Sequence, residues 1–340
     1  MQSSNPQSCE VAVIGAGLSA LVAAREFHRA GRDAHLFEKS RGLGGRMATR
    51  RLSEARFDHG CQFFTVRSES FAREVARWEQ QNLVAPWFNR MDEQGQASLN
   101  PDCENTRYRV AEGMTALPKA LGEGLPIHRQ HTVSEVRWTG GHWHLAFAEN
   151  EPTVTARALL STAPVPQTLA LLDGCGDDTV TQALEPLREV RYAPCFALMV
   201  LLDRQPVIGP SGFFAPREDP VVATLADNAA KGVSPRIGAI SILSTDTFAA
   251  AHFDQDPDEV TAKLLAAAKP WLTGCEVLES SLRRWKYARP VESFSEPGWL
   301  LPSHRLAVAG DAFGGPPRLE QAFLSGRWVA GEALKMLSPD

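Results

Sequence analysis

The stretch of residues 10–38, EVAVIGAGLSALVAAREFHRAGRDAHLFE, constrains the fold of this chain more than any other. A short apolar segment with strand character, Glu10–Ile14, runs into the glycine-rich turn GAGLSA. A helical pattern covers Ser19–Ala30, with apolar side chains on one side and charged ones on the other, and Asp33–Phe37 has the pattern of a second strand. Strand, turn, helix and strand within about 30 residues predict a nucleotide-binding βαβ unit.

The residue types in the turn suit the diphosphate of a dinucleotide. Gly15 permits the tight turn, Gly17 lets the backbone approach the diphosphate, and Ala20 is small enough for helix and strand to pack closely. The free N–H groups at the start of the helix then point at the anion. Glu38, about 20 residues past Gly17, is placed to accept hydrogen bonds from a ribose and would repel a 2′-phosphate, which argues against NADP. The predicted contacts are Gly15, Ala16, Gly17, Leu18, Ser19 and Glu38.

Two further glycine-rich segments favour FAD over NAD as this dinucleotide. Immediately after the βαβ unit, Lys39–Arg46 reads KSRGLGGR and can wrap the diphosphate from its far side, with the arginine neutralising charge. Near the carboxyl end, the strand-like Leu306–Ala309 leads into Gly310-Asp311 and then into a helical pattern from about residue 320 to 337. An aspartate there can hold a polyol hydroxyl, and the helix start can face the negative charge that develops on a reduced flavin. Both ends of the chain are therefore expected to form one FAD-binding domain.

These segments, together with FDHGCQFFT and RRWKYARP, resemble the renalase family of FAD-dependent, amine-oxidase-like flavoproteins, in particular its bacterial members. The resemblance extends from about residue 10 to 336 and is weakest in the middle. It implies an α/β fold in which a dinucleotide-binding, Rossmann-like FAD domain is interleaved with a mixed-sheet α+β substrate domain. The expected division assigns residues 1–67, 111–187 and 301–340 to FAD binding, and residues 68–110 and 188–300 to the substrate.

The resemblance also implies roles for individual residues. Arg46 matches an arginine on the far side of the diphosphate, Val133 a strand that meets adenine through its backbone, and Asp311 an acid near the ribityl chain. The segment His59–Phe64 matches one that runs past the isoalloxazine ring into the substrate pocket, and no catalytic side chain is assigned because flavin N5 does the chemistry. The implied FAD contacts beyond the first turn are Lys39, Gly45, Arg46, His59, Gly60, Val133, Gly310, Asp311, Leu319 and Glu320. The implied pocket residues are Cys61, Gln62, Phe63, Phe64, Trp285 and Tyr287.

Four positions depart from the family pattern. Ala312 follows the late Gly-Asp where the family usually has tryptophan, Cys61 stands where alanine is common, and His59 stands where an apolar residue is common. Ser241 is the best match for a histidine that family members often carry on a substrate-domain strand. These departures leave the FAD assignment intact and open the question of the substrate.

The substrate half mixes strand and helix patterns. Alternation in RRWKYARP puts Trp285 and Tyr287 on one face of a strand and Lys286 on the other, so we expect Lys286 in solvent. The two aromatic side chains belong either to a core or to the substrate pocket. Three strands and a helix are predicted at Cys195–Leu202, Ile237–Leu243, Ser281–Tyr287 and Pro257–Lys269.

Charge, hydropathy and cysteine spacing limit the remaining possibilities. A formal net charge of −5 without long like-charge blocks argues against a nucleic-acid partner. No apolar run approaches the ~20 residues of a membrane span, and MQSSNPQSCE does not read as a secretory signal, so we expect a cytoplasmic protein without a membrane partner. The six cysteines lack zinc-ligand spacing, so unpaired thiols and no metal site are expected. The late Gly-Asp segment has no cysteine, which favours non-covalent FAD, although Cys61 and His59 lie in the flavin-adjacent stretch.

Three functional hypotheses follow. In the first, which the renalase resemblance implies, an isomeric dihydronicotinamide with its hydride at ring position 2 or 6 reduces FAD, and O₂ reoxidises it to give H₂O₂. In the second, the chain is an amine oxidase for a small amine; such enzymes often flank the flavin with paired tyrosines, and this chain has only Tyr108, Tyr192 and Tyr287. In the third, the chain binds FAD without turnover. The partners are thus a small molecule and O₂, and the sequence carries no signal for an oligomeric state.

Overall fold

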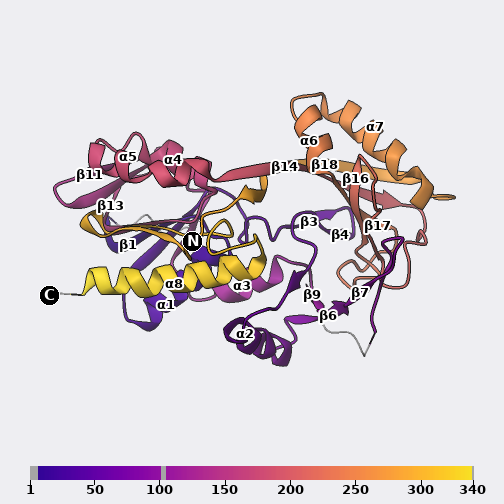
Figure 1. Cartoon of the computed structure of the whole chain (residues 1–340), viewed down its shortest axis with the longest axis horizontal. Coiled ribbons are helices and arrows are strands. Elements are labelled where there is room, and N and C mark those ends of the chain that lie inside the picture. Colours follow the sequence, from indigo (N-terminus) through magenta and orange to yellow (C-terminus); the bar gives the residue numbers. More distant parts are fainter. Residues whose placement is uncertain (1–6, 101–104, 339–340) are drawn as a thin grey trace. The chain divides into compact units, whose positions relative to one another are not determined.

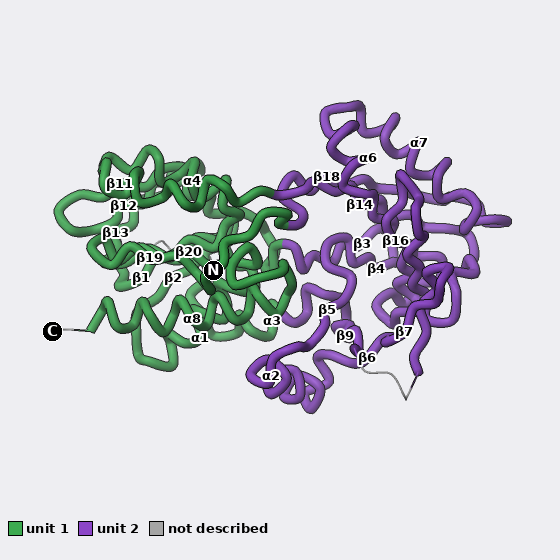
Figure 2. Tube along the Cα trace, viewed as in Figure 1, with its two compact units in different colours: residues 1–45, 118–191, 290–340 green, residues 46–117, 192–289 purple. Residues whose placement is uncertain are grey.

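The chain divides into two compact units, each assembled from separated segments (Figure 2). Unit 1 consists of residues 1–45, 118–191 and 290–340, and unit 2 of residues 46–117 and 192–289. The computed structural model describes residues 7–100 and 105–338. Residues 46–67, which the sequence assigned to the FAD-binding part, fall in unit 2.

Unit 1 is built on one eight-stranded sheet (Figure 1). Its strands are β1 (Ser8–Ile14), β2 (Ala34–Glu38), β10 (Ile127–Arg129), β11 (Val133–Thr139), β12 (His142–Phe147), β13 (Val154–Ser161), β19 (Trp299–Leu301) and β20 (Leu306–Val308). The order is β10-β2-β1-β13-β12-β11, and β20 pairs with β13 and β19. The pairs β10–β2, β2–β1, β1–β13 and β13–β20 are parallel, whereas β12 joins β13, β11 joins β12 and β19 joins β20 in antiparallel fashion. This is the expected Rossmann-like α/β arrangement, and the prediction of the fold class is confirmed.

Helices α1 (Leu18–Arg29) and α8 (Leu319–Leu337) lie side by side in unit 1 (Figure 1). The buried face of α1 is rich in alanine, and with Leu21 and Phe27 it packs against β1, β2 and α8. Gly31, with φ +70°, follows the helix as the expected terminating glycine. The other helices of unit 1 are α4 (Val165–Leu172), α5 (Asp178–Ala183), η1 (Glu185–Glu189) and η3 (Pro302–His304). Helix α3 (Ala116–Gly122) contains the point at which the chain passes from unit 2 to unit 1.

Unit 2 centres on a five-stranded sheet in the order β15-β16-β17-β14-β18. These strands are β14 (Arg191–Leu202), β15 (Phe213–Phe214), β16 (Val222–Asp227), β17 (Ala239–Ser244) and β18 (Val277–Glu292). Phe196, Leu198 and Val200 of β14 pack towards α6 (Asp246–His252) and α7 (Pro257–Ala268), whereas Met199 and Leu201 pack on Phe57 of β4 (Ala55–Asp58). Because both faces of this part of β14 are covered, the stretch Cys195–Leu202 is continuously apolar.

The remaining elements of unit 2 form smaller assemblies. They are the hairpin β3 (Thr49–Leu52) and β4 (Ala55–Asp58), the sheet of β5 (Phe64–Thr65), β9 (Arg107–Val110) and β6 (Val84–Phe88), the pair β7 (Arg90–Met91) and β8 (Ala97–Ser98), the helix α2 (Glu69–Gln80) and η2 (Lys269–Trp271). Across the described ranges of the chain, no helix is both long and apolar enough to cross a membrane.

Candidate functional site

The carboxyl ends of three neighbouring parallel strands of unit 1 lie level with one another at one edge of the sheet. Ile14 of β1 pairs with Ser161 of β13, and Ser161 pairs with Val308 of β20. The turn that begins at Gly15 and the late Gly310-Asp311 therefore leave the sheet at one edge, although they lie far apart in the sequence. Open α/β sheets bind ligands at the carboxyl ends of their strands.

The first glycine-rich turn has the geometry that a diphosphate site needs. Gly15 has φ +100°, and a Cβ on it would lie 2.8 Å from the hydroxyl of Thr162. At Gly17, by contrast, no described atom beyond its immediate chain neighbours lies within 4 Å of the position a Cβ would take, so the space over the turn is open. Helix α1 begins at Leu18 after its N-cap residue Gly17, with no side-chain cap from any described residue, which leaves its first N–H groups available to an anion.

Glu38 is buried at the end of β2, and its carboxylate is fixed by two backbone donors. Oε2 accepts from the N–H of Ala16 at 2.9 Å and Oε1 accepts from the N–H of Ser40 at 2.8 Å. Each carboxylate oxygen has a further lone pair for a ribose hydroxyl. The acid thus ties the first glycine turn to the start of the second glycine-rich segment.

That second segment lies directly against the first turn. The N–H of Gly44 donates to the carbonyl of Ala16 at 2.8 Å, and Gly44 forms a parallel bridge with Gly17. A Cβ on Gly45 would lie 3.8 Å from the Cα of Gly17. The exposed Lys39 begins this segment. The geometry agrees with a loop that encloses a diphosphate from a second side.

The approach to Val133 is hydrogen-bonded to the same region. The N–H of His131 donates to the carbonyl of Glu38 at 2.9 Å, and the N–H of Gln130 donates to the carbonyl of Ser40 at 3.2 Å. Val133 itself is 8% exposed and stands at a bulge of β11. The structure thus brings Glu38 and Val133, the predicted ribose and adenine contacts, into one neighbourhood.

The late Gly-Asp segment is anchored on helix α8. The N–H of Gly310 donates to Oγ of Ser325 at 3.0 Å, and the carbonyl of Ala312 accepts from the N–H of Phe294 at 2.8 Å. Ala312 and Phe313, at the position where the family usually has tryptophan, are buried in unit 1. Helix α8 begins with Leu319 and the buried Glu320, and no described side chain caps its N-terminus.

These residues of unit 1 fit FAD. Two long helices present uncapped N-termini, the space over Gly17 is open, and an oriented carboxylate stands at the end of β2. A dinucleotide with a ribose at one end and a developing negative charge at the other matches these groups. The predicted contacts that belong to unit 2 are Arg46, His59 and Gly60.

In unit 2 the segment Asp58–Phe63 is attached to residues 46–48. The N–H of His59 donates to the carbonyl of Ala48 at 3.0 Å, and the N–H of Cys61 donates to the carbonyl of Arg46 at 2.8 Å. A Cβ on Gly60 would lie 2.0 Å from the Arg46 carbonyl oxygen, so glycine is needed for this close approach. The guanidinium of Arg46 lies over the ring of Tyr192, 5.6 Å from its centre.

His59 is a buried, neutral ring. Its ring stacks on Trp285 with centres 5.5 Å apart, and the Trp285 indole N–H donates to the His59 carbonyl at 2.8 Å. Burial lowers the pKa of His59 to about 4. Within the described part of the chain, His59 Nδ1 and Gln62 Oε1 are buried without a hydrogen-bond partner. Unsatisfied buried polar atoms call for a water or a ligand group.

The next pocket candidates pack into unit 2. The Cys61 thiol donates to the carbonyl of Phe63 at 2.9 Å, and burial raises its pKa to about 11, so it is a protonated thiol rather than a nucleophile. Phe63 makes edge contacts with Phe88 and Phe213. Phe64 is 3% exposed and stacks on Tyr108 with ring centres 5.5 Å apart.

A fully buried ion pair beneath this segment was not foreseen from the sequence. Lys231 Nζ lies 2.6 Å from Asp58 Oδ2 and donates to the carbonyl of Gln62 at 2.6 Å, and both side chains have no exposed surface. It also lies 4.8 Å from the ring centre of Trp87. The pair joins positions 173 residues apart, and no motif or periodicity links them.

Ser241 is part of the same network. Its hydroxyl donates to the carbonyl of Asp58 at 2.7 Å and accepts from the side-chain amide of Asn228 at 2.9 Å. Asn228 Oδ1 in turn accepts from the N–H of Asp58 at 3.0 Å. Ser241, which the sequence matched to a family histidine, therefore anchors the segment at Asp58.

Strand β18 shows the expected alternation, since Trp285 and Tyr287 are partly buried and Lys286 is exposed. The strand is longer than predicted, Val277–Glu292 instead of Ser281–Tyr287. Its ends are exposed and include Val277, Leu278 and Val291, so the alternation of buried and exposed positions does not mark where the strand begins and ends. Tyr287 meets Tyr192 edge to face with ring centres 5.7 Å apart.

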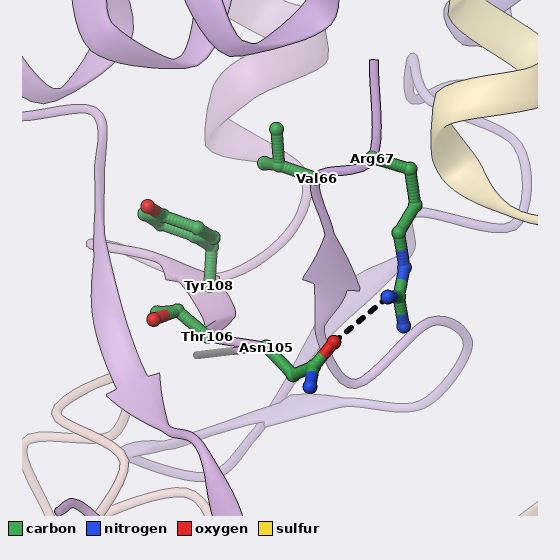
Figure 3. A pocket seen from close by; sticks show the side chains of 5 residues that line it. All are labelled: Val66, Arg67, Asn105, Thr106 and Tyr108. Carbon is green, nitrogen blue, oxygen red and sulfur yellow. Dashed lines mark hydrogen bonds between the residues drawn. The ribbon is translucent and has the colours of Figure 1, made fainter. Parts of the chain in front are cut away.

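Unit 2 also has an open hollow of about 330 Å³ beside β5 and β9 (Figure 3). Arg67 Nη1 donates to Asn105 Oδ1 across it at 2.7 Å. Tyr108 forms one wall and is backed by Phe64. The lining is Val66, Arg67, Asn105, Thr106 and Tyr108. None of the predicted pocket residues is among these five, and Phe64 stacks on Tyr108 from behind.

Solved structures share this fold at low sequence identity. A triple mutant of putrescine oxidase has 13% identity and a TM-score of 0.66, covering 96% of this chain and 99% of that one. A protein from Exiguobacterium sp. 255-15 that is provisionally described as a protoporphyrinogen oxidase has 14% identity and a TM-score of 0.69. The match covers 98% of this chain and 100% of that one. A fatty acid isomerase from P. acnes that produces CLA has 12% identity and a TM-score of 0.67, covering 98% and 100%.

Two family models match the sequence. One describes an NAD(P)-binding Rossmann-like domain and matches residues 13–77. The other describes flavin-containing amine oxidoreductases and matches residues 84–334, most of the chain. The match favours an enzyme over the third hypothesis, an FAD-binding protein without turnover. The chain therefore belongs to the flavin-containing amine oxidoreductase family and is an FAD-dependent oxidoreductase.

Proposed function

We propose that this chain is a renalase-like oxidase of an isomeric dihydronicotinamide, with the hydride at ring position 2 or 6. The FAD would accept that hydride and O₂ would take the two electrons onward. The overall balance is one dihydronicotinamide, one O₂ and one proton giving one aromatic nicotinamide cation and one H₂O₂. The segment Asp58–Phe63, with Trp285, is the proposed wall of the substrate pocket.

The observation that carries this proposal is that the ionisable groups of the segment are committed or neutral. Asp58 and Lys231 are paired with each other at 2.6 Å. Burial lowers the pKa of His59 to about 4 and raises that of Cys61 to about 11. A dihydronicotinamide loses hydride without first losing a proton, whereas an ammonium substrate must be deprotonated before it can be oxidised. A segment that offers no strong base suits the first substrate.

The chain's own residues would then act by shape and orientation. The stacked rings of His59 and Trp285 offer a flat surface for a heteroaromatic ring, and the bond from the indole N–H to the His59 carbonyl fixes their mutual orientation. Hydride transfer requires the donor carbon at about 3–3.5 Å from the acceptor, so a rigid wall supplies catalysis through positioning. The unpartnered His59 Nδ1 and Gln62 Oε1 are available to polar groups of the ligand.

Anaerobic reduction of the purified flavoprotein tests the proposal. The 2- and 6-dihydro isomers of NAD(P) should bleach the flavin rapidly, and the common 4-dihydro isomer should bleach it far more slowly. Admission of air should restore the colour and release one H₂O₂ per substrate oxidised. Bleaching by the isomers no faster than by the 4-dihydro form would refute the proposal.

The family supports a second candidate, oxidation of a small amine, and the tyrosine pair of unit 2 bears on it. Tyr192 and Tyr287 come together, as the second hypothesis requires of two of the three tyrosines. Two ring faces that hold a carbon chain between them need about 7 Å of separation, twice a ~3.5 Å contact. The observed edge-to-face contact at 5.7 Å is closer than that. Peroxide release from a panel of small amines that includes putrescine would establish this candidate, and silence across the panel would reject it.

A further inference from the structure

Helices α1 and α8 approach each other so closely that one position on α8 admits only glycine. A Cβ on Gly326 would lie 2.3 Å from the carbonyl oxygen of Ser19, 2.8 Å from its Cα and 2.9 Å from its carbonyl carbon. These are backbone atoms within the first turn of α1, so no side-chain rotation can relieve the clash. The two helices thus cross in contact at Ser19, a residue of the turn that is predicted to bind the diphosphate.

Two hydrogen bonds reinforce the same crossing. Ser19 Oγ donates to the carbonyl of Ala322, in the first turn of α8, at 2.7 Å. Ser325 Oγ accepts from the N–H of Gly310 at 3.0 Å. Ser19 and Ser325 are both buried. Residues 322–326 of α8 thus hold the first turn of α1 and the late Gly-Asp segment at once.

The helix starts that meet here differ from those of four other α-helices, whereas α4 also lacks a side-chain cap. The α2, α5, α6 and α7 N-termini are capped by Ser68, Asp177, Thr245 and Asp256, whose side chains accept from backbone N–H groups. Among the described residues, no side chain caps α1 or α8. The crossing therefore sets the relative position of two helix starts whose N–H groups are not used by side-chain caps.

We propose that Gly326, Ser19 and Ser325 are positioning residues that lock the first turns of α1 and α8 in one register, so that a single FAD meets both helix ends. The proposal rests on the FAD assignment and is independent of the substrate. Gly326 and Ser325 are not themselves predicted FAD contacts; they act through Ser19, Ala322 and Gly310. Because binding groups must be held to about 0.5 Å, a shifted helix start weakens the ligand's contacts.

Alanine at two glycines of the same helix separates positioning from general helix effects. In Gly331→Ala, the added methyl meets no described atom within 4 Å other than the neighbouring backbone of its own helix, whereas in Gly326→Ala it meets the backbone of Ser19. The Kd for FAD is measured by titrating the FAD-stripped full chain, together with the Tm of that stripped protein. We expect Gly326→Ala to weaken FAD binding by about tenfold or more and Gly331→Ala to leave Kd within about twofold.

Ser325→Ala provides a milder second variant if Gly326→Ala does not fold. It removes only the acceptor for the Gly310 N–H, and we expect FAD binding to weaken about threefold or more, with an altered visible circular dichroism of the bound flavin. A lower Tm of the stripped protein with unchanged Kd and flavin spectrum, in whichever variant folds, would show a purely structural role and overturn the proposal. Wild-type protein that takes up no FAD would refute the cofactor assignment itself, which is a different result.

Discussion

Removal of one partner of the Asp58–Lys231 ion pair is the sharpest test of how unit 2 holds its proposed pocket segment. In Lys231→Met the side chain keeps a similar length and loses its charge. The variant leaves Asp58 Oδ2 buried without its cation, and it removes the donor to the carbonyl of Gln62. Asp58 Oδ1 keeps its donors, the Thr49 hydroxyl at 2.5 Å and the Met114 N–H at 2.8 Å.

The expected loss follows from the geometry. At 2.6 Å, two unit charges attract by about 6 kcal/mol for an effective dielectric constant of about 20. Removal of the lysine also removes the cost of burying that lysine, so the net loss is smaller, about 3–5 kcal/mol in the free energy of unfolding. The double variant Asp58→Asn, Lys231→Met leaves no buried charge at the pair. It should therefore be less destabilised than the sum of the single variants, by about 2 kcal/mol or more.

Urea unfolding at fixed excess FAD, followed by tryptophan fluorescence, measures these values. Lys335→Met is a matched control, because Lys335 pairs with Glu332 at 2.7 Å while its side chain is 73% exposed. The control should lie within about 1 kcal/mol of the wild type. If Lys231→Met also stayed within that range, or if the two single losses simply added, the pair would not be the anchor of the segment.

Three further predictions follow from named groups. Glu38→Ala leaves the N–H groups of Ala16 and Ser40 without their acceptor and removes the proposed ribose contact, so the FAD Kd should rise about tenfold or more; an unchanged Kd on reconstitution would contradict the role. The pKa of His59 and that of His128 are each lowered by burial to about 4, so the unfolded chain binds more protons than the folded one between pH 6.5 and 4. The free energy of unfolding should fall as the pH drops through that window, and His59→Phe, which retains a ring against Trp285, should make the fall shallower; an identical slope would exclude His59 as a source. Acid precipitation should release the yellow chromophore into solution, because the thiol of Cys61 is protonated and donates to a backbone carbonyl; colour retained in the pellet would show a covalent flavin.

The parts of unit 1 that follow from local patterns were predicted closely. The helix expected at Ser19–Ala30 is observed at Leu18–Arg29, and the late strand expected at Leu306–Ala309 is observed at Leu306–Val308. In both cases the apolar pattern and the glycines next to it lie within a few residues of each other. Local sequence alone is therefore enough to predict the element and its ends. The meeting of both chain ends at one sheet edge followed from their matching strand–glycine–helix patterns.

The contacts that join distant segments were not predictable in the same way. Lys231 sits in a short loop after β16 and differs in no local pattern from a solvated lysine, but the fold brings Asp58 to it across 173 positions. Gly326 lies within the helical pattern expected from about residue 320 to 337, which gives no reason for a glycine there; the reason is the backbone of Ser19, about 300 positions away in the sequence. The residue type at such positions is determined by a segment that is close in space and distant in the sequence. A single sequence contains no periodicity or spacing that would reveal this proximity.

The neutral character of the pocket segment leads to a test that separates the two candidate substrates. If hydride transfer needs no base, its rate depends on pH only where a group of the pocket segment changes its charge. His59 does so at a pKa of about 4 and Cys61 at a pKa of about 11. The rate of anaerobic flavin reduction by a dihydronicotinamide isomer should then be constant across the neutral range. An amine substrate would instead show a limb that follows its own deprotonation, because the segment offers it no base. A reduction rate that changes tenfold between pH 6 and 9 with the nicotinamide isomer would mean that another group moves a proton in the rate-limiting step, and the argument from the committed ion pair would fail.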